Sequence, residues 1–118
     1  MSPDLAEVVL ITWLKAFVFT LVVEVPIFVI IARRAEIPLL KAALAGAAGT
    51  CFTHPALCFI WPLLFRDYTL YIVTGELLVA TIESFTFYAL ARPIPLKTAI
   101  AASFVANAAS YGLGAIIH

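Results

Sequence analysis

Four polar side chains that could carry protons or bind a cation lie inside otherwise apolar stretches of this sequence. Each comes from a different stretch, and together they are Glu24, His54, Glu83 and Asn107. An ionisable group at the centre of a bilayer costs about 3 kcal/mol or more, so it usually survives only where a partner or a function holds it. Two carboxyl groups and an imidazole can pass protons or bind a divalent metal ion, and Zn²⁺, Mn²⁺ and Fe²⁺ suit this donor set.

The four residues fall at one depth if each stretch is a helix that crosses the membrane. Each lies nine to thirteen residues from a basic residue at the end of its stretch, which is roughly 13 to 20 Å along a helix axis. Ser110 follows Asn107 by three residues and falls in the same layer. We therefore expect an ion- or metal-binding site near the middle of the bilayer, to which four helices each contribute one side chain.

The composition favours an integral membrane protein. Of the 118 residues, 64% are hydrophobic and 12% are charged, whereas a soluble domain of this size is about half apolar and a quarter charged. The formal net charge is zero, which argues against a nucleic-acid-binding surface. We expect one membrane domain, 1–118, with the lipid bilayer as a partner.

The spacing of the apolar runs predicts four transmembrane helices. The runs cover about 8–32, 39–65, 69–91 and 96–117, and each is long enough for a helix to cross about 30 Å of hydrocarbon. No run alternates polar and apolar residues, so strands are the weaker interpretation. Because the connections are short, consecutive helices should be antiparallel neighbours. The expected fold is an all-α four-transmembrane-helix bundle.

The distribution of basic residues predicts the orientation of the bundle. The first and third connections, with their flanks, hold most of the basic residues: Arg33, Arg34, Lys41, Arg92 and Lys97. The positive-inside rule places these connections in the cytoplasm, with the N-terminus and the C-terminus outside. The acidic N-terminal segment does not have the form of a cleaved signal peptide. The compact loops suit the inner (plasma) membrane of a bacterium.

The two halves of the sequence resemble each other. Glu24 recurs as Glu83 at an offset of 59, together with neighbouring aromatic and basic residues. After the first connection, a Pro-Leu pair recurs at an offset of 57 and Lys41 recurs at 56. We expect a duplicated helical hairpin, whose two parallel copies are related by an axis along the membrane normal. The predicted repeats span about 8–65 and about 69–117.

The second stretch also holds a candidate site for a soft metal ion. Cys51, His54 and Cys58 are spaced i, i+3 and i+7, which places them on one face of a helix and suits Cu⁺ or Zn²⁺. Buried cysteines more often behave as small hydrophobic side chains. We therefore expect these two cysteines to pack as small hydrophobic side chains rather than to bind a metal ion.

Glu76 is a further acidic residue within an apolar run. It lies seven residues before Glu83, so both share a helix face, with Glu76 nearer the outside. It could form the next step of a pathway that leads outward from Glu83. It could equally be an acid paired with Arg66 or Lys15.

These residues support three hypotheses about function. In the first, the protein binds or conducts a cation, a proton or a divalent metal, as a homo-oligomer, because 118 residues can hardly enclose a pathway alone. In the second, it is a non-catalytic subunit or assembly factor of a membrane complex, and the polar network only stabilises the bundle. In the third, it is a small intramembrane metal-dependent hydrolase. An enzyme is the less favoured class, because no serine lies in a GxSxG motif.

Overall fold

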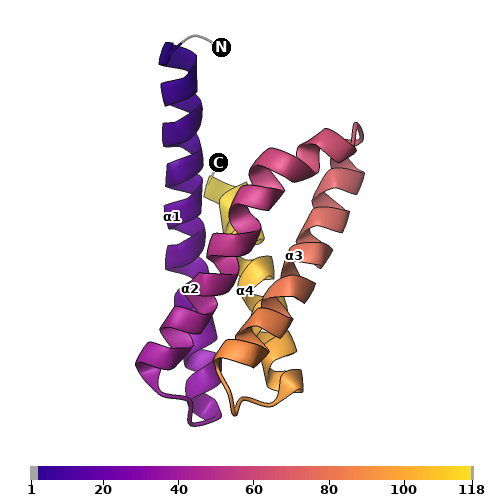
Figure 1. Cartoon of the computed structure of the whole chain (residues 1–118). Helices are drawn as coiled ribbons and strands as arrows, with labels where there is room; N and C mark the ends of the chain where they lie inside the picture. Colours follow the sequence, from indigo (N-terminus) through magenta and orange to yellow (C-terminus); the bar gives the residue numbers. More distant parts are fainter. Residues whose placement is uncertain (1–2, 118) are drawn as a thin grey trace.

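The computed structural model describes residues 3–117, which form four long helices without a strand among them (Figure 1). Residues 1, 2 and 118 of the expected membrane domain lie outside the described residues. All four helices are long and apolar enough to cross a membrane, consistent with an integral membrane protein. The prediction of an all-helical protein with four helices long and apolar enough to span a membrane is confirmed. The helices are α1 (Pro3–Arg34), α2 (Leu39–Pro55), α3 (Tyr68–Leu90) and α4 (Leu96–Ile117).

The ends of the helices follow local sequence signals. α1 begins at Pro3 with Asp4 in its first turn and ends with Arg33 and Arg34, charges that match the helix dipole at each end. It is therefore longer than the predicted run 8–32, because its first turns are less apolar than its centre. The side chain of Asp67 caps α3 by accepting hydrogen bonds from the backbone N–H groups of Thr69 and Leu70, at 2.8 and 3.2 Å.

The second span is interrupted after Pro55. The chain continues as a π-helix, Ala56–Ile60, and then as a 3₁₀-helix, Trp61–Leu64, rather than as the single regular helix implied by the apolar run 39–65. Proline has no backbone N–H and its ring crowds the preceding turn, so a regular α-helix is disfavoured here. Two hydrogen bonds hold this irregular segment against α3. The Tyr71 hydroxyl donates to the carbonyl of Leu57 at 3.2 Å, and the Trp61 indole donates to Thr74 at 3.3 Å.

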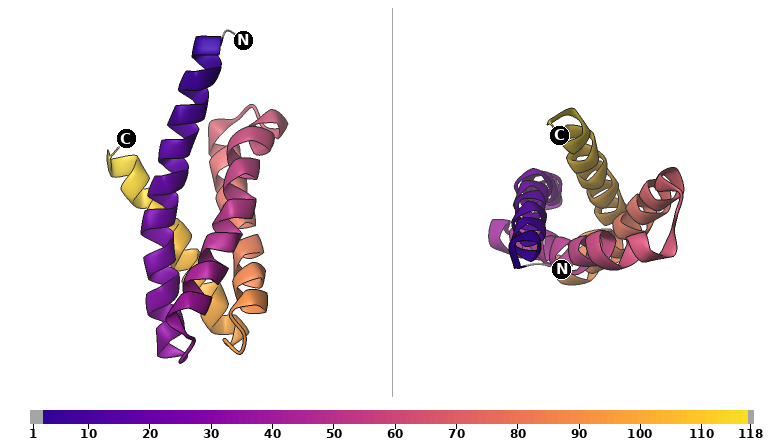
Figure 2. Two further views of the ribbon diagram at one scale, coloured as in Figure 1. Left: turned by 60° about the vertical axis from the view of Figure 1, so that its left-hand side comes forward. Right: turned by 90° about the horizontal axis from the view of Figure 1, so that it is seen from above.

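The helices form two antiparallel hairpins, α1–α2 and α3–α4, packed side by side (Figures 1 and 2). The connections within the hairpins lie at one end of the bundle, which we call the loop end. The α2–α3 connection and both chain termini lie toward the other end, which we call the terminal end. Toward the terminal end, α4 leans away from the α2–α3 pair (Figure 2).

The loop end has a tightly packed core. Phe28 of α1 and Phe87 of α3 are each 1% exposed, and their ring centroids are 4.5 Å apart. Gly46 of α2 makes room for this pair, because a Cβ atom added there would lie 3.0 Å from Phe28. Such close approach through small residues is a common way to pack helices in membranes.

The buried faces of the two hairpins use corresponding positions. In α1 and α3 these positions are 59 residues apart, as Phe28 and Phe87 are. In α2 and α4 they are 57 apart, so the predicted offset of 56 for Lys41 is not the register of the buried faces. The buried residues of α4 are Ala99, Ala102, Ser103, Ala106 and Asn107, and those 57 positions earlier, also buried, are Ala42, Ala45, Gly46, Gly49 and Thr50.

Candidate cation-binding site

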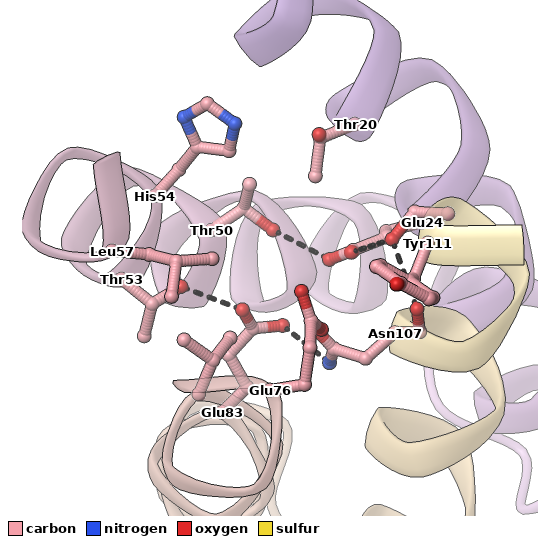
Figure 3. A pocket seen from close by; sticks show the side chains of 12 residues that line it. Thr20, Glu24, Thr50, Thr53, His54, Leu57, Glu76, Glu83, Asn107 and Tyr111 are labelled. Atoms are coloured by element: carbon pink, nitrogen blue, oxygen red, sulfur yellow. Dashed lines mark hydrogen bonds between the residues drawn. The ribbon is translucent and has the colours of Figure 1, made fainter. Parts of the chain in front are cut away.

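A cavity of about 110 Å³ lies between the four helices, just beyond the phenylalanine core (Figure 3). The four residues predicted to lie in one layer all line it, as do both Glu76 and Ser110. Helices that are distant in sequence therefore bring the predicted polar residues to one place. The residues of this layer are Glu24, His54, Glu83 and Asn107.

The Glu24 side chain is 1% exposed and accepts hydrogen bonds from two hydroxyl groups. Thr50 of α2 donates to Oε1 at 3.1 Å, and Ser110 of α4 donates to Oε2 at 2.5 Å. Phe28 lies one turn along α1 toward the loop end, so the packed core holds the backbone of the glutamate in place. Both carboxyl oxygens of Glu24 are thus oriented by neutral donors.

Glu83 is 2% exposed and has an equivalent environment. Thr53 of α2 donates to Oε2 at 2.6 Å, and the amide of Asn107 donates to Oε1 at 3.2 Å. The same amide nitrogen also donates to the carbonyl of Ser103 at 2.8 Å, which fixes its orientation. Gly49 allows α2 to approach, because a Cβ atom there would lie 3.1 Å from Cγ of Glu83.

The two carboxyl groups are bound in the same pattern. Each accepts one hydrogen bond from the second helix of its own hairpin and one from the second helix of the other hairpin. The own-hairpin donors, Thr50 and Asn107, are 57 positions apart, and so are the other-hairpin donors, Thr53 and Ser110. The threonines were not predicted as site residues. Their spacing from Asn107 and Ser110 is the signal that could have identified them.

Electrostatics distinguishes this cavity from an ordinary polar network. Glu24 and Glu83 line one cavity and are close enough to interact with each other. No lysine or arginine is among the described residues that line it, and Lys15 of α1 is exposed elsewhere on its helix. Like charges repel strongly in a medium of low dielectric constant. A bound proton or another cation would balance the charge of this pair.

Glu76 is half-buried and borders the same cavity (Figure 3). Within residues 3–117 its carboxyl group makes no hydrogen bond and no ion pair. In particular, it is not paired with Arg66 or Lys15, which was one of the two predicted roles. Its carboxyl group lies close enough to that of Glu24 to interact with it electrostatically.

His54 is buried against aromatic side chains and points away from the two carboxyl groups (Figure 3). Its Nδ1 accepts a hydrogen bond from the Trp13 indole at 3.1 Å, and its ring stacks on Phe17 with centroids 5.4 Å apart. An accepting Nδ1 is the neutral tautomer with the proton on Nε2. His54 thus lines the cavity without bonding to either glutamate.

The described residues contain no group of three or more His, Cys, Asp or Glu side chains placed to hold a metal ion. Of the two cysteines, Cys58 lies beside His54, with Sγ 3.8 Å from Nδ1. Cys51 is exposed on the outer surface of α2. The three residues of the soft-metal candidate are therefore not brought together. The oxygen donors around Glu24 and Glu83 are the remaining candidate ligands.

Comparisons of this chain with protein-family models, with curated proteins and with solved structures found no match. The function must therefore be argued from the site itself.

Proposed function

We propose that this protein binds a cation, either a proton or a small metal ion, at the Glu24–Glu83 pair inside the membrane. The observation that supports this most strongly is the absence of a basic side chain among the described residues around two carboxyl groups that are at most 2% exposed. Hydroxyl and amide donors orient a carboxylate, but only a cation removes its charge. An unpaired charge buried in a membrane costs several kcal/mol, so the pair binds a cation.

The residues around the pair have distinct roles in this proposal. The two glutamates bind the cation, and their four neutral donors orient the carboxyl groups. If the cation is a metal ion, the oxygen-rich surroundings favour Mn²⁺ among the three metals that the sequence suggests. A Zn²⁺ or Fe²⁺ site would require His54, which is directed elsewhere in this conformation. The four donors are Thr50, Thr53, Asn107 and Ser110.

The bundle is, in this proposal, a duplicated hairpin with its pseudo-twofold axis along the membrane normal. The equal spacing of the buried residues and the matched donors of the two glutamates support the duplication. The terminal end then faces the outside, because five of the basic residues are at the loop end. A site on the axis takes one ligand from each repeat, as expected for a cation shared by Glu24 and Glu83.

A second candidate function is purely structural. Among the described residues, no buried side-chain nitrogen or oxygen lacks a hydrogen-bond partner. The network also connects all four helices, so it stabilises the bundle whether or not it binds an ion. This observation favours a subunit or assembly factor whose polar residues only determine packing.

Carbodiimide modification separates the two candidates. Hydrophobic carbodiimides react with protonated carboxyl groups, and a bound cation protects the carboxylate it occupies. The protein in lipid nanodiscs would be treated with the reagent across a series of pH values and added Na⁺, Mn²⁺ or Zn²⁺, and the modified peptides quantified by mass spectrometry. We expect modification at Glu24 or Glu83. It should decrease as the pH is raised, and also when a competing metal ion is added, because each removes the protonated carboxyl group.

Glu24→Gln and Glu83→Gln identify the reactive residue, and Glu36→Gln, at an exposed loop position, is the matched control. In the structural alternative, modification of the pair does not respond to pH or to any metal ion. That result would contradict the cation-binding proposal.

A further inference from the structure

Two clefts lie in the terminal half of the bundle, at the two corresponding interfaces between the hairpins. One lies between α1 and α4, and the other lies between α2 and α3. Five residues of the first cleft each correspond to a residue of the second, at the offset of 59 for α1 and α3 and of 57 for α2 and α4. The pairs are Ala16 with Gly75, Phe19 with Leu78, Thr20 with Val79, Ser110 with Thr53, and Gly114 with Leu57.

The two clefts differ in size because of a few side chains. The α1–α4 cleft has a volume of about 430 Å³, and the α2–α3 cleft has about 180 Å³. In the smaller one, Leu57 and Trp61 cover Gly75 so closely that an added Cβ would lie 2.6 and 3.0 Å from them. In the larger one, Leu57 is replaced by Gly114, whose added Cβ would meet its nearest neighbour only at 3.7 Å.

The clefts also differ in polarity where each meets the central cavity. Three residues of the α1–α4 cleft line the cavity as well, and all three carry hydroxyl groups: Thr20, Ser110 and Tyr111. Three residues of the α2–α3 cleft do the same, but two of them are apolar: Thr53, Leu57 and Val79. Ser110 donates directly to Glu24, so the hydroxyl-lined side leads to the carboxyl pair.

We infer that the α1–α4 cleft is the aqueous entrance through which a small hydrated cation reaches the Glu24–Glu83 pair from the terminal end. Hydroxyl groups along this path replace part of the water around the cation as it enters. The α2–α3 cleft is the closed counterpart, sealed by Leu57 and Trp61 and held by the hydrogen bonds of Trp61 and Tyr71. That the entering species is a cation rests on the proposed function, whereas the presence of water in the α1–α4 cleft does not.

Thiol labelling tests the entrance with a pair of matched positions. The native thiols are first removed by Cys51→Ala and Cys58→Ala. Thr20→Cys and Val79→Cys then place single thiols at corresponding sites that both border the central cavity. A membrane-impermeant, positively charged thiosulfonate should label Thr20→Cys rapidly in nanodiscs and leave Val79→Cys unlabelled.

Exchanging the residues that distinguish the clefts should exchange their behaviour. Gly114→Leu, added to Thr20→Cys, should slow labelling by about tenfold or more, which corresponds to a barrier about 1.4 kcal/mol higher. Leu57→Gly, added to Val79→Cys, should make that thiol reactive. Phe85→Cys, on a lipid-facing position of α3 that is 56% exposed, controls for exposure to lipid without water and should not react.

Circular dichroism of each variant verifies folding. Titration of all thiols after denaturation verifies that an unlabelled thiol is present. If Thr20→Cys does not fold, Ala16→Cys samples the same cleft. Equal labelling in both clefts, or no labelling in the α1–α4 cleft, as expected if a lipid chain fills it, would overturn the inference. The carbodiimide experiment is independent of this result. If the α1–α4 cleft is not labelled but carbodiimide modification depends on cations, only the proposed entrance is rejected. If the cleft is labelled but modification does not depend on cations, only the proposed cation binding is rejected.

Discussion

The loop-end half and the terminal half of the bundle use the same repeated positions differently. At the loop end, corresponding residues of the two hairpins have corresponding environments, and the rings of Phe28 and Phe87, each residue 1% exposed, pack against each other at a tilt of 48°. At the terminal end, α2 changes to a π-helix and a 3₁₀-helix after Pro55, whereas α4 continues as a regular helix to Ile117. One half is symmetrical and closely packed, and the other is asymmetrical and holds the larger clefts.

The carboxyl pair lies at the boundary between these halves, and this position explains how a site can be both rigid and accessible. Glu24 and Glu83 each lie one turn from the phenylalanine core, which fixes their backbones. Their donors Thr53 and Ser110 lie on the terminal side, where the helices diverge. The loop end therefore positions the carboxyl groups, and in the function that we propose the terminal end determines what reaches them.

The largest expected effect is on the packing of the loop end. Phe28→Ala should lower the free energy of unfolding by about 3 kcal/mol or more, because it leaves a cavity in the tightest part of the bundle. The matched control is Phe85→Ala, since Phe85 is 56% exposed. Denaturation in micelles followed by circular dichroism measures both. Similar losses for the two variants would contradict a core confined to the loop end.

The next effect concerns the approach of α2 to the carboxyl pair. Gly49→Ala adds a Cβ atom 3.1 Å from Cγ of Glu83, and overpacking of this kind costs about 1–3 kcal/mol. Gly112→Ala meets nothing within 4 Å in the terminal half and should be neutral or stabilising by about 0.5–1 kcal/mol. The same unfolding measurement separates them. A loss for Gly112→Ala as large as that for Gly49→Ala would show that the terminal half is also closely packed.

Double-mutant cycles compare the two glutamates directly. Thr50→Val with Glu24→Leu, and Asn107→Leu with Glu83→Leu, each remove one donor and its acceptor. Hydrogen bonds between membrane helices contribute about 0.6 kcal/mol on average and about 1.7 kcal/mol at most. We expect similar coupling energies for the two cycles. A coupling present in one cycle and absent in the other would break the correspondence of the two hairpins at the site.

The smallest effect is expected at the aromatic contact of the terminal half. Trp13→Phe removes the donor to His54 Nδ1 and should cost no more than about 0.6 kcal/mol. Its consequence should be local, with faster amide hydrogen exchange near His54 and unchanged exchange near Phe28. Faster exchange throughout the loop end would contradict the independence of the two halves.

The sequence could predict the four spans and the shared depth of the polar residues because charge is rare and hydropathy is strong in this chain. Glu24 and Glu83 are conspicuous in apolar helices for the same reason. Threonines are not, since small hydroxyl residues are ordinary packing residues in membrane helices. The one signal that Thr50 and Thr53 give as donors is their spacing of 57 from Asn107 and Ser110.

Other features depend on tertiary contacts that spacing does not encode. Lys41 suggested an offset of 56, but an exposed lysine is free to shift by one position, whereas the buried faces correspond at 57. His54 lines the same cavity as the other three predicted residues, yet its ring is hydrogen-bonded to Trp13, 41 residues earlier in the chain. Pro55 indicates an interruption of its helix, although not the form that the interruption takes.

The most direct test of the central proposal is infrared difference spectroscopy of the carboxyl groups. The protein in lipid would be compared at different pH values and with and without Mn²⁺, Zn²⁺ or Na⁺, beside Glu24→Gln, Glu83→Gln and the control Glu36→Gln. The cation-binding proposal predicts a C=O band of a protonated carboxyl group that changes with pH or with a metal ion, is altered in the first two variants, and is unaffected by Glu36→Gln. A carboxyl spectrum that stays constant under every condition would contradict it and leave the pair as part of a structural network.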